Sequence, residues 1–521
     1  RIIFPSGILQ HGLKDIAGIL PSVKNAMLLY IHIPFCERKC RYCDFFSGVK
    51  TEEEAFLRAL FKEIEGYKIN SGMATSHIGG SLERNRSETI FGNSPRRFNS
   101  ENAAAHTDGF LKMDPYSDAF GGDLIGKMAE RAANESVSSV FFGGGTPSLL
   151  RDGAVGEILS ALSAVFKIED RAEISAEGNP ESLTANKLRE WKSAGINRVS
   201  VGVQSFDDGV LRAIGRVHDA ETAARALSDA ADIIGNVNAD LMTGLPGQRE
   251  GAALYAAKRA AELGVKHVSC YELKLEKNTA LYEDVMRGAV SLPDDELRAD
   301  LFDEAVDALA AAGFNRYEIS NFAKPGFECS HNAGYWRRRN YIGFGPSAAS
   351  FFEREIGVYN DKTTRLTAVS DNIRNSEADR TDILRRQSQF GGGVISGVRY
   401  ANKPDYKAYL QSEEKGSFER EIEFIDVEAA LFETVMLGLR LTAGININEL
   451  ERKFGIDFYA RFGAAIKKYE TCFERTLPPL TKDSQHEEIN VLDGGVLRLN
   501  RRGFEIMNMI LVDLLYESGR H

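Results

Sequence analysis

The sequence predicts an α/β protein built on a largely parallel sheet, which either closes into a barrel or stays open as a doubly wound sheet. Short β-rich runs alternate along the chain with Ala-rich stretches whose apolar residues recur at helical spacing. Most gaps between successive runs have the length of a strand–helix–strand unit, and such repetition is typical of parallel sheets. A change of pattern near residue 400 predicts a separate C-terminal domain.

Each strand is predicted from a short run of apolar and β-branched residues. The expected strands are residues 29–33, 139–142, 172–176, 198–203, 237–242, 267–273 and 316–319. Helices are expected between them, with clear examples at residues 52–67, 221–233 and 251–263. The main domain is therefore predicted to span residues 29–352, after an N-terminal lead-in at residues 1–28.

Two stretches interrupt this pattern and are expected to be insertions. Residues 69–118 are polar and rich in Gly, Ser, Asn and Arg, and the gap in which they lie is far longer than one helix needs. Residues 353–399 carry many Thr, Ser, Asn and Arg residues and end with Gly391–Gly393, so they are an insertion or an interdomain linker. Ordinary loops folded onto the surface would have a similar composition.

The C-terminal domain, residues 400–521, is predicted to be small, α+β and similar to a winged helix. Helices are expected at residues 427–441, 447–454 and 504–515. A hairpin is expected at residues 491–499, with its turn at Asp493-Gly494-Gly495. A domain of this kind does not by itself imply DNA binding.

Composition excludes several classes of protein. The chain has 521 residues, with 64 Lys and Arg against 75 Asp and Glu, a net charge of −11. Binding to phosphates needs a concentrated basic surface, so no nucleic-acid partner is expected. No apolar run reaches about 18 residues and the first residues lack a signal-peptide pattern, so we expect no transmembrane segment and a cytoplasmic location. The six cysteines do not resemble a disulfide framework and indicate a reducing compartment.

Three of the cysteines form one motif, C-x3-C-x2-C, at Cys36, Cys40 and Cys43 after the first predicted strand. Three thiolates on a tight loop can hold three corners of a cubane iron–sulfur cluster and leave the fourth iron open to a small chelating molecule. Zinc is the main alternative, but a structural zinc site needs four ligands and only His32 is nearby. Unliganded structural thiols are a third interpretation.

This motif resembles the radical S-adenosylmethionine (SAM) superfamily, and its surroundings resemble the HemN/HemW family within it. The resemblance covers most of the chain outside the two insertions. It implies a partial (β/α)6 barrel, a [4Fe-4S] cluster at the C-terminal end of the sheet, and SAM chelating the open iron. It also implies that an electron, supplied by a donor such as flavodoxin or ferredoxin, could cleave SAM to a 5′-deoxyadenosyl radical.

The expected SAM pocket combines motif residues at several strand ends. Gly143-Gly144-Gly145-Thr146-Pro147 matches the family's GGGTP, although a plain tight turn would use the same glycines. A carboxylate such as Glu177 at a strand end suits a ribose diol, although without the resemblance it would more often cap a helix or lie at the surface. The resemblance implies SAM contacts by Tyr30, Tyr42, Gly144, Gly145, Thr146, Glu177, Gln204, Arg216 and Asp240. The structural alternative for these side chains is a set of buried polar groups that satisfy one another.

Several observations favour the haem-chaperone branch, HemW, over the oxidase branch, HemN. The oxidase motif has a fourth cysteine two residues after the third, where this chain has Phe45, and a longer segment before the first strand. The sequence from His331 to Trp336 matches the HNxxYW motif of HemW, whose histidine is a proposed haem ligand. His331 is therefore expected to bind haem iron, with Cys329 as the alternative ligand. Without the resemblance, His331 and Trp336 would be interpreted as packing residues.

Other residues around this motif bear on haem binding. The guanidinium groups of Arg337, Arg338 and Arg339 can pair with haem propionates. After Gly345-Pro346 the family usually has Gly-Ala-His-Ser, whereas this chain has Ser-Ala-Ala-Ser, so its set of haem ligands can differ. Cys270 and Cys472 are expected to be buried structural thiols.

The sequence therefore predicts a haem chaperone that binds a [4Fe-4S] cluster, SAM and haem, and transfers haem to an unidentified acceptor protein. The alternative is an oxygen-independent coproporphyrinogen III oxidase of porphyrin biosynthesis. A third hypothesis is a radical enzyme with an unrelated substrate. No residue is assigned as catalytic.

Overall fold

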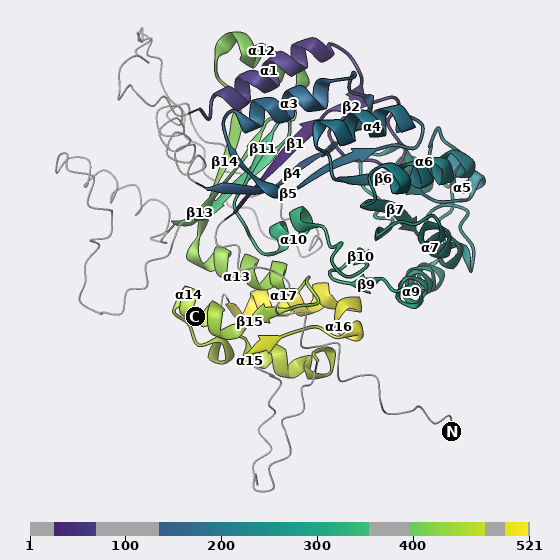
Figure 1. Ribbon diagram of the computed structural model, residues 1–521. Helices are drawn as coiled ribbons and strands as arrows, with labels where there is room; N and C mark the ends of the chain where they lie inside the picture. Colours follow the sequence, from purple (N-terminus) through teal and green to yellow (C-terminus); the bar gives the residue numbers. More distant parts are fainter. Residues whose placement is uncertain (1–25, 69–134, 354–394, 475–494, 519–521) are drawn as a thin grey trace, which may run out of the picture.

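The computed structural model describes residues 26–68, 135–353, 395–474 and 495–518 (Figure 1). The predicted insertion at residues 69–118 lies outside the described residues. So do nearly all of the N-terminal lead-in and most of residues 353–399.

The core of the fold is a run of parallel strands, which confirms the predicted α/β class. Strands β1, β4, β5, β6, β7 and β8 are neighbours in that order, and β11 pairs in parallel with the other side of β1. Their bounds are Met27–Ile33, Ser136–Gly144, Lys167–Gly178, Arg198–Gln204, Val237–Thr243, His267–Glu272 and, for β11, Tyr341–Phe344. Because parallel strands end at the same edge of a sheet, the loops after β1, β4, β5, β6 and β7 meet there.

Antiparallel strands extend both edges of this sheet. Beyond β11 lie β12 (Ala349–Glu353), β13 (Ile395–Asn402) and β14 (Arg420–Asp426). Beyond β8 lie β10 (Asn321–Ala323) and β9 (Asn315–Arg316).

The expectation of a strand at residues 316–319 was wrong beyond its first residue. The side chain of Arg316 donates to the carbonyl oxygens of Glu318 and Ile319, and the Glu318 carboxylate accepts from the Ser320 amide. These local bonds turn the chain where a strand was expected to continue.

Helices cover the outer face of the sheet (Figure 1). They are α1 (Glu53–Glu65), α3 (Ala154–Ser163), α4 (Ala185–Ala194), α6 (Ala220–Ile233), α7 (Ala252–Glu262) and α9 (Asp295–Ala311). The short helices α5 (Asp208–Ala213) and α8 (Ala280–Met286) belong to a separate, smaller hydrophobic cluster. Side chains such as Thr184, Asp219 and Asp294 accept from backbone N–H groups in the first turn and so fix where helices begin. The outward residues of the strands are apolar and join the helices in one hydrophobic core. None of the helices in the described ranges is long and apolar enough to cross a lipid bilayer.

The C-terminal segments surround a second hydrophobic core below the sheet (Figure 1). They are α13 (Val427–Gly438), β15 (Ile445–Asn446), α14 (Ile447–Phe454), α15 (Phe458–Lys468), β16 (Val496–Leu497), α16 (Arg501–Glu505) and α17 (Met507–Ser518), while α12 (Tyr406–Lys415) packs on α1. The helix expected at Ile447–Phe454 is confirmed with the same bounds. Residues 491–494 of the hairpin expected at residues 491–499 lie outside the described residues. In the described part of this range, β16 pairs with β15.

The division into domains stays a prediction. The boundary expected at residue 400 falls inside β13, which belongs to the large sheet. The residues of the second core that follow it in the chain begin at Ile425, so we propose that the C-terminal domain starts close to that residue.

Candidate cofactor and ligand site

The inner faces of the parallel strands carry polar side chains at alternating positions. Alternate residues of a strand point to opposite faces of the sheet, so one face can be polar while the other is apolar. The inward residues enclose a cavity of about 200 Å³, lined by Tyr30, Phe141, Glu177, Arg198, Ser200, Asn238, Asp240, Ser269, Tyr271, His331, Asn332 and Tyr335. We call it the polar cavity.

Two predicted site residues, Glu177 and Asp240, line this cavity, and the pKa of each carboxyl group is raised above its ordinary value. Burial, followed by the charge of Asp240, raises the pKa of Glu177 to about 8. Burial also raises the pKa of Asp240, although its carboxylate accepts from Ser200 at 2.8 Å and from Asn238 at 2.8 Å. The two carboxyl groups can therefore accept from, or donate to, the hydroxyl groups of a ligand.

The three motif cysteines lie together on the loop that follows β1. Cys36 ends β2 (Phe35–Cys36), which pairs with β3 (Gly48–Val49), and all three thiols are free and half-buried. Thr146 donates to Cys36 Sγ over 3.7 Å, and Arg216 Nη1 donates to Cys40 Sγ over 3.4 Å. Donors that face sulfur stabilise thiolates, so this donor set fits an iron–sulfur cluster.

The geometry of His32 bears on the zinc alternative. Its Nε2 lies 2.8 Å from the carbonyl oxygen of Phe46, and its Nδ1 lies 3.1 Å from the Tyr30 hydroxyl. Both ring nitrogens are thus engaged, and His32 does not offer a fourth ligand to the cysteines in this arrangement. Among the described side chains, no three His, Cys, Asp or Glu residues lie close enough to hold one metal ion.

The GGGTP segment packs so closely against the residues that follow β1 that two of its positions require glycine. The Gly145 amide donates to Ile33 O at 2.7 Å, and the Thr146 amide donates to Phe35 O at 2.6 Å. A Cβ on Gly145 would collide with the Phe35 carbonyl, and one on Gly144, where φ is +102°, would collide with the His32 ring. These contacts position the cysteine loop, while contact of Gly144 and Gly145 with SAM stays a prediction.

Arg216 joins the cysteines to the ends of β5 and β6. Its Nη2 donates to Asn179 Oδ1 at 2.8 Å and to Gly202 O at 2.6 Å, and Asn179 Nδ2 donates to Thr146 at 3.1 Å. Asn179 was not among the predicted site residues, although it lies only two residues after Glu177, which was.

Two further predicted SAM residues lie close to this network. Gln204 ends β6 in a left-handed conformation with φ +66°. Burial raises the pKa of Tyr42, which lies on the cysteine loop near Arg216. Their contact with SAM stays a prediction.

His331 lies in α10 (Ser330–Trp336), between the sheet and the C-terminal helices (Figure 1). Its Nδ1 is 2.8 Å from Ser139 Oγ, its Nε2 is 3.0 Å from the Tyr335 hydroxyl, and its ring stacks on Phe141. Burial, followed by the charge of Arg198, lowers its pKa to about 3, so the imidazole is neutral. A haem iron at Nε2 would have to displace the Tyr335 hydroxyl, and ligation by His331 stays a prediction.

Cys329, the alternative ligand, precedes α10. Its thiol is buried and donates to Glu173 Oε1 at 3.3 Å. Burial raises its pKa to about 12, so it stays protonated in this arrangement.

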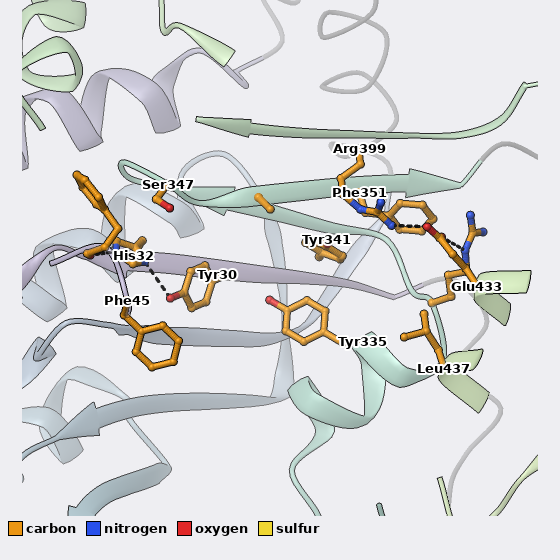
Figure 2. A pocket seen from close by; sticks show the side chains of 13 residues that line it. Tyr30, His32, Phe45, Tyr335, Tyr341, Ser347, Phe351, Arg399, Glu433 and Leu437 are labelled. Atoms are coloured by element: carbon orange, nitrogen blue, oxygen red, sulfur yellow. Dashed lines mark hydrogen bonds and ion pairs between the residues drawn. The ribbon is translucent and has the colours of Figure 1, made fainter. Parts of the chain in front are cut away.

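A second, larger cavity of about 440 Å³ lies beside the polar cavity and shares Tyr30 and Tyr335 with it (Figure 2). We call it the aromatic cavity. It is lined by Tyr30, His32, Phe45, Phe46, Tyr335, Arg338, Tyr341, Ser347, Ala349, Phe351, Arg399, Glu433 and Leu437. Of the three arginines expected near haem propionates, only Arg338 lines it, and Ala349 stands where the family usually has histidine.

Comparison with known proteins shows which family models and relatives the chain matches. The family described as Radical SAM superfamily matches residues 112–260, and the HemN C-terminal domain matches residues 425–506. The heme chaperone HemW of Escherichia coli is 34% identical over 61% of this chain and 68% of that protein. The chain belongs to the HemW family of radical SAM proteins. The Bos taurus protein named radical S-adenosyl methionine domain-containing protein 1, mitochondrial, is 33% identical over 94% of this chain and 87% of its own length.

A solved structure shares the fold of this HemW-family chain. Coproporphyrinogen III oxidase (HemN) from Escherichia coli aligns with a TM-score of 0.61 at 19% identity, covering 94% of this chain and 90% of that one. The likeness confirms the radical SAM fold that the motifs predicted.

Among the lining residues of the aromatic cavity, two charged ones were missed from the sequence, Arg399 and Glu433. They lie in β13 and α13, and no motif marks them. The fold alone brings them to Arg338.

Proposed function

We propose that this protein is a haem chaperone of the radical SAM type, which binds haem, a [4Fe-4S] cluster and SAM and passes haem to an acceptor protein. Membership of the HemW family supports this proposal. The observation that carries it is the meeting of two cavities of different chemistry, polar and aromatic, at Tyr30 and Tyr335. A polar nucleotide cofactor suits the first cavity, and a flat macrocycle suits the second.

In this proposal, Cys36, Cys40 and Cys43 hold the cluster, while Thr146 and Arg216 donate to the sulfurs. Glu177 and Asp240 bind hydroxyl groups of SAM in the polar cavity. When bound, the cluster supplies an electron that can cleave SAM. A flavodoxin or ferredoxin would serve as electron donor.

His331 is the proposed iron ligand. Its neutral imidazole is the form that binds iron, and Tyr335 would have to move away from Nε2 to expose it. Tyr335 lines both cavities, so this movement would open the aromatic cavity toward His331.

The alternative function is that of an oxygen-independent coproporphyrinogen III oxidase. The fold likeness to HemN fits it equally well. The residue at position 45 favours the chaperone, because Phe45 is 67% exposed at the rim of the aromatic cavity, where the oxidase motif has a fourth cysteine.

The cellular location is part of the same proposal. All six cysteines are unpaired, as expected in a reducing compartment such as the cytoplasm. The Bos taurus relative is named as a mitochondrial protein.

Haem titration of anaerobically reconstituted protein tests this function. We expect a saturable Soret band at one haem per chain that weakens and shifts in His331→Ala, with Cys472→Ala, a buried thiol of the second core, as control. A wild type without a Soret band would contradict haem binding, and an unchanged band in His331→Ala would contradict the ligand. Conversion of coproporphyrinogen III to protoporphyrinogen IX with SAM and a reductant would favour the oxidase.

A further inference from the structure

Charged side chains from three separate segments close one end of the aromatic cavity. Arg338, just after α10, donates from Nε to Glu433 Oε2 at 3.0 Å and from Nη1 to Glu353 Oε1 at 2.5 Å. Arg399 of β13 donates from Nη2 to Glu433 Oε1 at 2.8 Å. One carboxylate, Glu433, thus bridges two guanidinium groups at the cavity wall.

Arg338 keeps one buried donor without an acceptor. Its side chain is only 4% exposed, yet its Nη2 has no hydrogen-bond partner among the described residues. Its backbone is held in the left-handed region, with φ +54°. Buried donors are normally satisfied, so this nitrogen indicates an acceptor that arrives with a ligand.

Most of the other lining residues are aromatic, so the cavity has one charged end and a largely aromatic remainder. The Phe351 ring lies 4.5 Å from the Arg338 guanidinium and 5.9 Å from that of Arg399. Figure 2 shows Tyr335 and Tyr341 between this charged end and the end formed by Tyr30, His32 and Phe45. A planar apolar molecule with acidic groups on one edge matches both surfaces.

We propose that Arg338 and Arg399 form the carboxylate anchor of the aromatic cavity and bind the propionate groups of a tetrapyrrole. This inference rests on the proposed function and names the part of the ligand that the cavity recognises. Glu433 balances the two guanidinium groups when no ligand is present, and its charge opposes an entering propionate. Arg337 and Arg339, next to Arg338 in sequence, do not line the cavity.

The test compares haem with haem dimethyl ester, which keeps the ring and iron but lacks the two negative charges. We expect wild-type protein to bind haem at least tenfold more tightly than the ester in Soret titrations. Arg399→Gln is expected to lower the affinity for haem about tenfold and to leave that for the ester unchanged. Glu433→Gln is expected to raise the affinity for haem, because the opposing charge is removed.

Glu423→Gln is the matched control. Glu423 also accepts from Arg399, at 2.6 Å, but does not line the cavity, so its substitution should leave both affinities unchanged. Equal wild-type affinity for haem and ester, or an equal loss of both in Arg399→Gln, would overturn the anchor while leaving the haem chaperone in place. Failure of the wild type to bind either compound would overturn the proposed function and the anchor with it.

Discussion

Glu177 shows how its surroundings change the chemistry of a single carboxyl group. Burial, followed by the charge of Asp240, raises its pKa from 4.5 to about 8. Between these values the folded protein keeps a proton that the unfolded chain releases. The stability of the wild type is therefore expected to fall, by roughly 1 kcal/mol or more, as pH rises from about 4.5 to about 8.

Glu177→Gln, which cannot titrate, checks this prediction in urea unfolding at several pH values. The variant should gain free energy of unfolding relative to wild type across that window. Glu181→Gln is the control of opposite sign: although Glu181 is half-buried, its hydrogen bond to His218 and the charge of Arg216 hold its pKa below the ordinary value. Parallel pH curves for wild type and Glu177→Gln would contradict the raised pKa.

At the residue scale, the sequence could identify site residues that lie close together along the chain. Cys36, Cys40 and Cys43 could be found because a tight loop brings short spacings together whatever the rest of the fold does. Arg399 and Glu433 could not, because their meeting with Arg338 depends on the pairing of β13 with β12 and on the packing of α13.

At the scale of elements, α10 depends on a neighbouring strand for its start. Its N-cap residue, Cys329, makes no side-chain capping bond. Glu173 of β5 replaces that cap: it accepts from the amides of Ser330, at 2.8 Å, and His331, at 3.3 Å, and from the Cys329 thiol. The strand thus holds the helix that carries His331.

Glu173→Ala is therefore expected to lower the free energy of unfolding by about 2 kcal/mol, because the first turn of α10 loses its acceptors. Glu169→Ala, on the same strand, removes a single bond to Ser136 and should cost about 0.5 kcal/mol or less. Urea denaturation of both variants measures the difference. An equal loss of stability in the two would show that Glu173 does not cap α10.

Strands were predictable where polar and apolar residues alternate, as in β6 and the first five residues of β7, since one face meets the helices and the other the cavity. Residues 316–319 also looked like a strand, but side-chain bonds from Arg316 override β propensity there. The expected boundary at residue 400 was placed from a change in composition, which does not reveal that β13 joins the main sheet.

At the scale of the whole molecule, one buried carboxylate joins the first helix to segments more than 280 residues away. Glu63 of α1 accepts from the Gly345 amide at 2.9 Å, from Asn402 at 2.7 Å and from the Tyr409 hydroxyl at 2.7 Å. It also forms an ion pair with Arg420, whose charge is nearly buried. These contacts attach α12, β13 and β14 to the barrel.

Glu63→Ala should therefore destabilise the molecule by about 3 kcal/mol, because it leaves Arg420 buried without its partner charge and orphans the other donors. Glu65→Ala, an exposed substitution two residues along the same helix, should change stability by less than about 0.5 kcal/mol. If Glu63 is what couples residues 395–426 to the barrel, its loss should also lower the denaturant m value or split the transition in two. A Glu63→Ala curve that coincides with that of Glu65→Ala would show that apolar packing of α12 on α1 is sufficient to hold the two parts together.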